Sequence, residues 1–393
     1  MKVKLSVICY LLSVICFTIY SYSQVDLNLT LNQNPLYLSF QEKLTNLGYY
    51  HRPLSTAVFL FLILSLFTIH YSLFTAVKNQ KLKSYQIVPL IILTTVLLFS
   101  YPAFSHDIFN YIFDAKIVWV YRQNPWEKSP NQFVGDAMLR FMHWVHRPSV
   151  YPPIWIGLSL PAVAFSLNKF IIQLFLMKFL IGLFHLGAVF LIFKILGEIA
   201  PRKKFLGTVF FAFSPLVLVE DLISAHNDIA MLFFVLLSIY LFLRKKSLFS
   251  LLALFFSIGI KYMTAVFLPF WLLGWFFSKR GVRIDFSSVL RLLAWVSLLV
   301  FAIFVFKFEF QPWYLIWVVP FVALAIEDKI LVGLTIALSV AALLRYAPFL
   351  YYGHYAPPVP RIKFWLTVVP IGLWAGLSIV DFFRNILKSE VTS

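Results

Sequence analysis

Two aspartates at helical spacing, Asp107 and Asp114, are the residues of this sequence whose type and position best suit acid–base chemistry. They lie in a segment that mixes acids, bases and aromatic residues between two strongly apolar regions, SHDIFNYIFDAKIVWVYRQNPWEKSP. On a helix, both aspartates and Tyr111 share one face. A carboxylate held in this way can accept the proton of a hydroxyl group as that group attacks another atom. We therefore take Asp107 as the candidate general base.

The segment around these acids predicts an amphipathic helix that lies at a membrane surface. Asn124 and Pro125 are expected to end it, because proline cannot continue a helix and disfavours the helical conformation in the residue before it. A second amphipathic piece is expected at 132–146. The apolar run 154–167 is short for a membrane span, and we expect it to re-enter the membrane or lie on its surface.

Composition indicates an all-α polytopic membrane protein. Hydrophobic residues make up 61% of the chain and charged residues 12%, which is more apolar surface than a soluble domain can bury. Apolar runs of hydrocarbon length recur from end to end and predict about twelve transmembrane helices in a single integral membrane domain, 1–393. Cys9 and Cys16 both lie in the first apolar run, so the sequence predicts no disulfide framework.

The net charge of +17 is best explained by membrane topology rather than by nucleic acid. The bases cluster in short loops between apolar runs, as the positive-inside rule expects of cytoplasmic loops. These loops include Lys78, Lys81 and Lys83, and the segments 202–204, 244–246 and 279–283. On this assignment both termini are cytoplasmic, unless the first apolar run is cleaved. The segment 105–167 then becomes an exterior catalytic loop with amphipathic and re-entrant helices.

The residues of this loop resemble the first exterior loop of membrane glycosyltransferases of the GT-C superfamily, and above all the polyprenol-phosphate-mannose-dependent mannosyltransferases. Ala115 stands where that family usually has glycine, and Trp126 where it has tyrosine. The loop residues that carry the resemblance are Asp107, Phe109, Tyr111, Asp114, Lys116, Asn124 and Pro125. Further motifs follow in the family's order as Tyr151-Pro152-Pro153, Ser214-Pro215, His226-Asn227-Asp228, Ile260-Lys261-Tyr262 and Pro312-Trp313-Tyr314.

The resemblance implies an inverting glycosyltransferase of the plasma membrane. Its donor would be a mannose-like hexose on a polyprenyl phosphate, and its acceptor a lipid, glycan or protein at the exterior face. Asp107 would be the general base, and Asp114 or Asp228 would orient it or the sugar hydroxyls. The resemblance implies no cofactor and leaves the need for a divalent cation open.

Transfer from a lipid phosphate also calls for a cation near the leaving group, because negative charge develops there. Lys261, at a break between two short helices, and His354, in a late exterior loop, are the candidates for this phosphate contact. The other motif residues are candidates for substrate binding: Tyr111, Lys116, Asn124, Tyr151, His226, Asn227, Tyr262, Trp313 and Tyr314.

Simpler roles compete with these assignments. Asp107 and Asp228 could merely begin helices, and Lys261 could extend to the membrane interface. The tryptophans Trp119, Trp126, Trp144 and Trp155 are interpreted as interfacial anchors. The spacing of His106, His143 and His146 does not indicate a metal site, so the sequence predicts none.

Two other functions fit the same architecture. A transporter or flippase would place functional polar residues near the middle of the membrane, whereas the candidates here concentrate at one face. A lipid-linked glycan polymerase or ligase also works outside with lipid-linked donors. Its usual signature is a large exterior loop late in the chain, and the late loop here, 348–363, is short. Both remain alternatives to the transferase.

Overall fold

A computed structural model describes residues 2–27, 29–82 and 84–391. Lys83, one of the bases assigned to a cytoplasmic loop, lies outside them. Every regular element of the described residues is helical, which confirms the predicted all-α class. The α-helices are α1 (Lys2–Ser21), α2 (Pro35–Thr45), α3 (Arg52–Lys78), α4 (Ser84–Thr94), α5 (Asp107–Trp119), α6 (Pro153–Ala164), α7 (Phe170–Ile199), α8 (Lys204–Ala212), α9 (Pro215–Val217), α10 (Asp228–Leu243), α11 (Ser247–Ile258), α12 (Leu268–Lys279), α13 (Phe286–Lys307), α14 (Val319–Leu324), α15 (Lys329–Leu344), α16 (Ala347–Tyr352) and α17 (Val359–Val391).

Within the described residues, six helices are long and apolar enough to cross a membrane, or seven if a bent pair counts as one span. The six are Val7–Gln24, Arg52–Lys78, Phe170–Ile199, Phe286–Lys307, Lys329–Tyr352 and Val359–Phe382. The bent pair is Pro201–Ala212 with Pro215–Ile223. Most of the other predicted spans fall on apolar helices of 10–17 residues, whose rise is less than the roughly 30 Å of a hydrocarbon core. The chain is therefore a multi-pass membrane protein, and about twelve spans remain a prediction.

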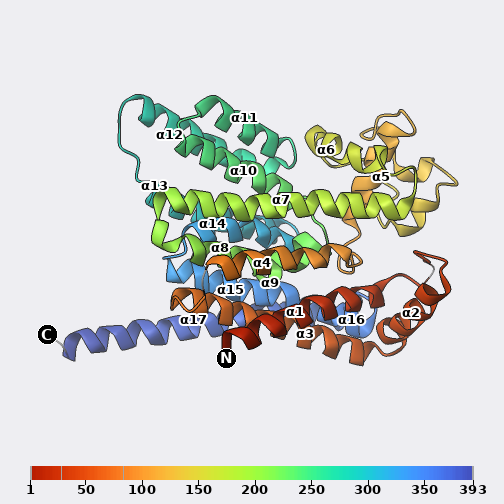
Figure 1. The fold of residues 1–393 in the computed structure, drawn as a ribbon, viewed down its shortest axis with the longest axis horizontal. Helices are drawn as coiled ribbons and strands as arrows, with labels where there is room; N and C mark the ends of the chain where they lie inside the picture. The colour runs from red at the N-terminus through yellow and green to blue at the C-terminus, as the bar shows by residue number, and fades with distance from the viewer. Residues whose placement is uncertain (1, 28, 83, 392–393) are drawn as a thin grey trace.

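The helix α7 defines two ends of the molecule. Its 30 residues rise about 45 Å. At its start, the Phe170 ring packs on Phe109 and Phe141, with ring centroids 6.0 and 4.0 Å apart. At its other end, Glu198 pairs with Arg244 over 2.9 Å. Figure 1 shows α2, α5, α6 and α16 at one end of the long helices, on the right of that view.

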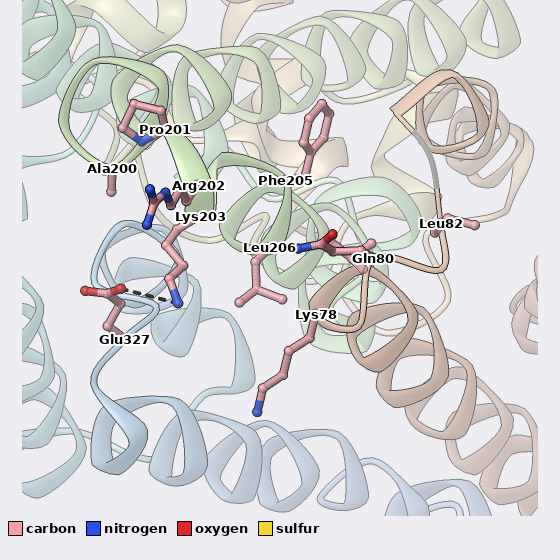
Figure 2. Close-up of a pocket in the computed structure, with 11 residues that line it drawn as sticks. Lys78, Gln80, Leu82, Ala200, Pro201, Arg202, Lys203, Phe205, Leu206 and Glu327 are labelled. Carbon is pink, nitrogen blue, oxygen red and sulfur yellow. Dashed lines mark ion pairs between the residues drawn. The ribbon is translucent and has the colours of Figure 1, made fainter.

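A cavity of about 1030 Å³ lies at the opposite end from α5, where α3 and α7 finish. Its lining includes Lys78, Arg202 and Lys203 (Figure 2). Lys203 pairs there with Glu327, its Nζ 3.4 Å from Oε1. Several of the basic loops thus gather at the end of α7 that is far from α5.

The helix α5 ends earlier than the sequence predicts. It stops at Trp119, before Asn124 and Pro125 are reached. The reason is a turn that closes on the last part of the helix: the Gln123 N–H donates to the Ile117 carbonyl over 3.0 Å, and Arg122 takes a left-handed φ of 55°. Proline therefore does not end this helix.

The rest of the segment 105–167 also differs in part from the prediction. The expected amphipathic piece at 132–146 follows the 3₁₀ turn η4 (Pro130–Gln132) and contains one short 3₁₀ segment, η5 (Ala137–Phe141), and no α-helix. Tight turns replace a helix there because the side chain of Asp136 accepts the Met138 N–H over 2.9 Å and begins η5. The short apolar run is present as α6, and its re-entry into the membrane remains a prediction.

The predicted break at Lys261 is present. The helix α11 ends at Ile258 and a 3₁₀ segment, η8 (Tyr262–Phe267), begins after Lys261. The start of α6 docks on this break, since the Ile154 N–H donates to the Gly259 carbonyl over 3.1 Å. A Cβ at Gly259 would lie 2.4 Å from Ile154 Cδ1 and 2.7 Å from its Cγ1, so a larger residue there would force the Ile154 side chain to move. The contact joins the segment 105–167 to the element that carries Lys261.

Candidate active site

Asp107 is the first residue of α5, where the helix dipole favours an acid. Its N–H donates to Ser105 Oγ over 3.2 Å, and its side chain is 19% exposed. Tyr111 follows one turn later and is buried. The first turn of α5 therefore presents a carboxylate that solvent can reach, next to a phenol that it cannot.

Three consecutive residues, His226, Asn227 and Asp228, face this end of α5. His226 Nδ1 lies 3.7 Å from Asp107 Oδ2. The Tyr111 hydroxyl donates to Asn227 Oδ1 over 3.3 Å and lies 3.4 Å from the Asn227 N–H. Asp228 Oδ1 accepts from Lys261 Nζ over 2.7 Å. One short turn thus connects the face of α5 to the break at Lys261.

The backbone that presents this turn is strained. Ala225 takes a φ of 60°, a left-handed conformation that costs a residue with a Cβ about 1–2 kcal/mol. Residues held in such conformations cluster at functional sites, where the surrounding structure enforces them. Here the following residue, His226, donates its N–H to the Glu220 carbonyl over 3.0 Å. The strained residue therefore directly precedes a backbone hydrogen bond that fixes the main chain of His226.

The imidazole of His226 is fully buried between acids. Its Nε2 lies 3.4 Å from Glu220 Oε2, and Glu220 Oε1 accepts from the Tyr346 hydroxyl over 2.9 Å. The Trp313 ring stacks on it, with centroids 4.5 Å apart. Burial by itself lowers the pKa of His226, but the hydrogen bond and charge of Glu220, with the charge of Asp107, raise that pKa above its ordinary value. The site thus favours an imidazolium that balances two carboxylates.

The ammonium group of Lys261 is bound by Asp228 but remains partly exposed to solvent. Its side chain is 25% exposed, whereas Asp228 is buried. Asp228 Oδ1 also accepts from Trp317 Nε1 over 2.5 Å, so this oxygen has two donors. An ammonium group has three donors, and Lys261 directs one to Asp228 and a long one, 3.5 Å, to Asn227 Oδ1. The third donor has no acceptor among the described residues and can contact an anion from the exposed side.

Asp114 lies two helical turns, about 10 Å, from Asp107 along α5. Its side chain is buried, and its Oδ2 has no hydrogen-bond partner among the described residues. Burial raises the pKa of this carboxyl to about 7, against the opposing effects of a hydrogen bond with Ser149 and the charge of Arg147. Asp114 is therefore a protonatable group within the loop, placed deeper than Asp107.

Two other candidates, Lys116 and Asn124, make their contacts within the segment 105–167 itself. Lys116 Nζ lies 2.5 Å from Asp136 Oδ2, which also accepts from the Tyr121 hydroxyl over 2.6 Å. Asn124 Oδ1 accepts the Trp126 N–H over 3.0 Å, and its amide donates to Glu127. These contacts hold the loop together.

The remaining candidates fall into two groups. The rings of Tyr151 and Tyr314 pack beside the site, on Tyr111 and Trp317 with centroids 4.9 and 4.8 Å apart. Tyr262 and His354 are exposed. His354 follows α16, and its ring packs against Tyr352 at 5.8 Å rather than against any other candidate in the described part of the chain.

Sequence reasoning missed Glu220, Tyr346 and Trp317. Glu220 had a usable signal, since an acid within an apolar run is functional by default. Tyr346 had none, because it lies 126 positions from Glu220 in the sequence. Trp317 follows the Pro312-Trp313-Tyr314 motif by one helical turn, and only the 3₁₀ segment η9 (Pro312–Trp317) turns its indole toward Asp228.

Comparison with known protein families gives one match. Residues 25–277 match the family model described as alpha-(1->6)-mannopyranosyltransferase, N-terminal domain. The matched region is well over half of the chain and includes α5, the turn at His226–Asp228 and Lys261. The chain matches no curated protein and no solved structure. Membrane helices, the arrangement of the acids and this match agree, and the protein belongs to the MptA_B family of alpha-(1->6)-mannopyranosyltransferases.

Proposed function

We propose that this protein is an inverting mannosyltransferase that uses a polyprenyl-phosphate donor at the exterior face of the plasma membrane. The acceptor is a lipid, glycan or protein, and the family description suggests an alpha-(1->6) linkage. The observation that carries the proposal is the turn His226–Asp228, which places a carboxylate and an ammonium group on one connected framework.

Asp107 is the general base of this reaction. As the acceptor hydroxyl attacks the anomeric carbon, its proton passes to the carboxylate of Asp107. The bond between the anomeric carbon and the phosphate oxygen breaks, and the lipid phosphate leaves with the electron pair. Inversion at that carbon means that an alpha product requires a beta-linked donor. The partial exposure of Asp107 lets an acceptor reach it, and the His226 ring lies 3.7 Å from its Oδ2.

Lys261 contacts the donor phosphate. Its exposed side and free donor suit an oxyanion, and a fixed cation is most effective where charge grows in the transition state. Asp228 holds this ammonium group in position through the 2.7 Å contact. Asp228 is thus a positioning residue, and Asp107 is the carboxylate left open to the acceptor.

The distribution of charge supports an exterior site. Lys78, Arg202 and Arg244 lie at the end of α3 and α7 that is far from α5. Bases of short loops mark the cytoplasmic side of a membrane protein. The length of α7, about 45 Å, is enough to separate these bases from Asp107 across a membrane, and this supports an exterior position for Asp107.

The test is transfer by purified protein in lipid vesicles. Polyprenyl-phosphate mannose with a mannoside acceptor should yield one added sugar per acceptor, with an alpha anomeric proton in the NMR spectrum of the product. A nucleotide-linked mannose should give none, since the sequence contains no Gly-rich phosphate loop. Transfer from the nucleotide donor alone would overturn the proposal.

Two further outcomes identify the alternatives. Movement of the donor lipid across the vesicle membrane without transfer would indicate a flippase. Products that carry many added sugars would indicate a polymerase. Asp381→Asn, an exposed substitution on α17, serves as the control that should leave transfer unchanged.

A further inference from the structure

Three side chains with metal-binding atoms meet beside α5, although the sequence separates them widely. Asp26 follows the 3₁₀ turn η1 (Tyr22–Gln24), His106 directly precedes α5, and His143 lies in the loop between η5 and α6. Asp26 and His106 are 80 positions apart. Because no spacing pattern links these residues, the sequence predicts no metal site among the histidines.

The distances suit ligands of one ion. One ligand atom from each residue lies within 4.8 Å of the other two. His106 Nε2 lies 3.3 Å from Asp26 Oδ2, which is about the separation of two ligands on a tetrahedral ion with bonds of about 2.0–2.1 Å. The rings of His106 and His143 have centroids 3.9 Å apart. His143 is exposed, so rotation of its side chain can bring the third atom to bonding distance.

A simple ion pair between His106 and Asp26 does not account for the position of His143 beside them. No hydrogen bond joins its imidazole to another residue of the described chain. Two imidazoles this close to one carboxylate compete for a single negative charge, whereas a divalent cation binds both as neutral ligands. The exposed side of the cluster also leaves room for ion entry and for water as a fourth ligand.

We propose that Asp26, His106 and His143 form a binding site for a zinc-class divalent ion. Two imidazoles and one carboxylate suit borderline ions of this class, whereas Mg²⁺ and Ca²⁺ prefer oxygen ligands. The ion fixes the loop of Asp26 and the loop of His143 to the residue directly before Asp107. It is a structural site that positions the start of α5, and it does not depend on the reaction assigned to Asp107.

The experiment measures zinc rather than transfer. Tag-free protein in detergent is stripped with a chelator, titrated with Zn²⁺ alone, passed through a desalting column and analysed for bound metal. The wild-type chain should retain one ion, and His143→Ala should lower the affinity at least about tenfold. Exposed His146 on the same loop gives a matched control, and His146→Ala should bind like the wild type.

Cobalt provides an independent readout. Co²⁺ in this site should give the visible absorption of a tetrahedral ion, and Asp26→Asn should remove it. Zinc should raise the thermal midpoint of the wild type but not of His143→Ala, because only a bound ligand stabilises the folded state. Equal zinc content in the wild type and His143→Ala would mean an adventitious ion only. That result, or no binding by the wild type, would overturn the inference while leaving the proposed transferase unaffected.

Discussion

His226 Nδ1 lies 3.7 Å from Asp107 Oδ2, so a fully buried imidazole faces the one carboxylate of the site that solvent can reach. On its other side, Nε2 lies 3.4 Å from Glu220 Oε2. The two nitrogens therefore lie between a partly exposed carboxylate, Asp107, and a buried one, Glu220. The left-handed Ala225 directly precedes this imidazole, and the position of the ring between two acids leads to the first prediction.

His226→Gln should destabilise the protein, because Glu220 then stays buried without its cation. Breaking a buried charge pair typically costs about 3–5 kcal/mol, and a second change, Glu220→Gln, should recover part of that loss. The raised pKa of His226 fixes the sign of the pH effect. Its stabilisation is fully present below about pH 6.5 and is lost as pH rises through the folded-state pKa.

Thermal unfolding in detergent at a series of pH values measures this effect. The gap in midpoint between wild type and His226→Gln should be largest at low pH and should narrow as pH rises. A gap that widens with pH would contradict a protonated His226.

Asp107→Asn should abolish most transfer while leaving the fold and donor binding intact. Asparagine keeps the size of aspartate but cannot take the proton of the acceptor, and positioned bases contribute about 10² to 10⁴ in rate. Initial rates with polyprenyl-phosphate mannose provide the measurement, with donor binding followed separately. Near-normal turnover in this variant, with loss in Asp228→Asn, would move the role of base to Asp228.

Lys261→Ala should weaken donor binding and turnover together. Phosphate charge is present in the bound donor and grows in the transition state, so the ammonium group contributes to both. Exposed Lys245, at the other end of α10, provides the control variant Lys245→Ala. Unchanged donor affinity in Lys261→Ala would indicate that Lys261 only neutralises Asp228.

Asp114→Asn should raise the thermal midpoint at pH 8 but not at pH 4. The pKa of the carboxyl is about 7 in the folded state and about 4 when unfolded. The folded state therefore holds this proton more tightly, and stability falls as pH rises between these two values. The full penalty is at most about 4 kcal/mol, from about 1.4 kcal/mol per pKa unit. Equal midpoints for the two proteins at pH 8 would show that Asp114 is not titrating there.

Membrane orientation can be read from single cysteines in a background without Cys9 and Cys16. Val134→Cys and His354→Cys, both at exposed positions near α5 and α16, should react with an impermeant thiol reagent added outside cells. Lys245→Cys should react only after the membrane is opened. Reaction of Lys245→Cys from outside would reverse the topology and place the site in the cytoplasm.

The sequence alone determined the class of the protein and predicted which end of it carries the candidate site. Runs of apolar residues are local properties, so membrane helices follow from composition, and the break at Lys261 follows from a local interruption of one run. The first-loop pattern around Asp107 was sufficient to indicate a glycosyltransferase. Each of these features depends on residues that are neighbours in the chain.

Tertiary structure decided which of these residues meet. The contact of Asp107 with His226 spans more than a hundred positions, and the hydrogen bond of Tyr111 with Asn227 spans 116. Short-range patterns carry no information on such pairs, because they depend on how α5 packs against the turn before α10. The early end of α5 at Trp119 was missed for a related reason. A hydrogen bond from Gln123 and a left-handed Arg122, both set by the folded loop, stop the helix before Pro125 can.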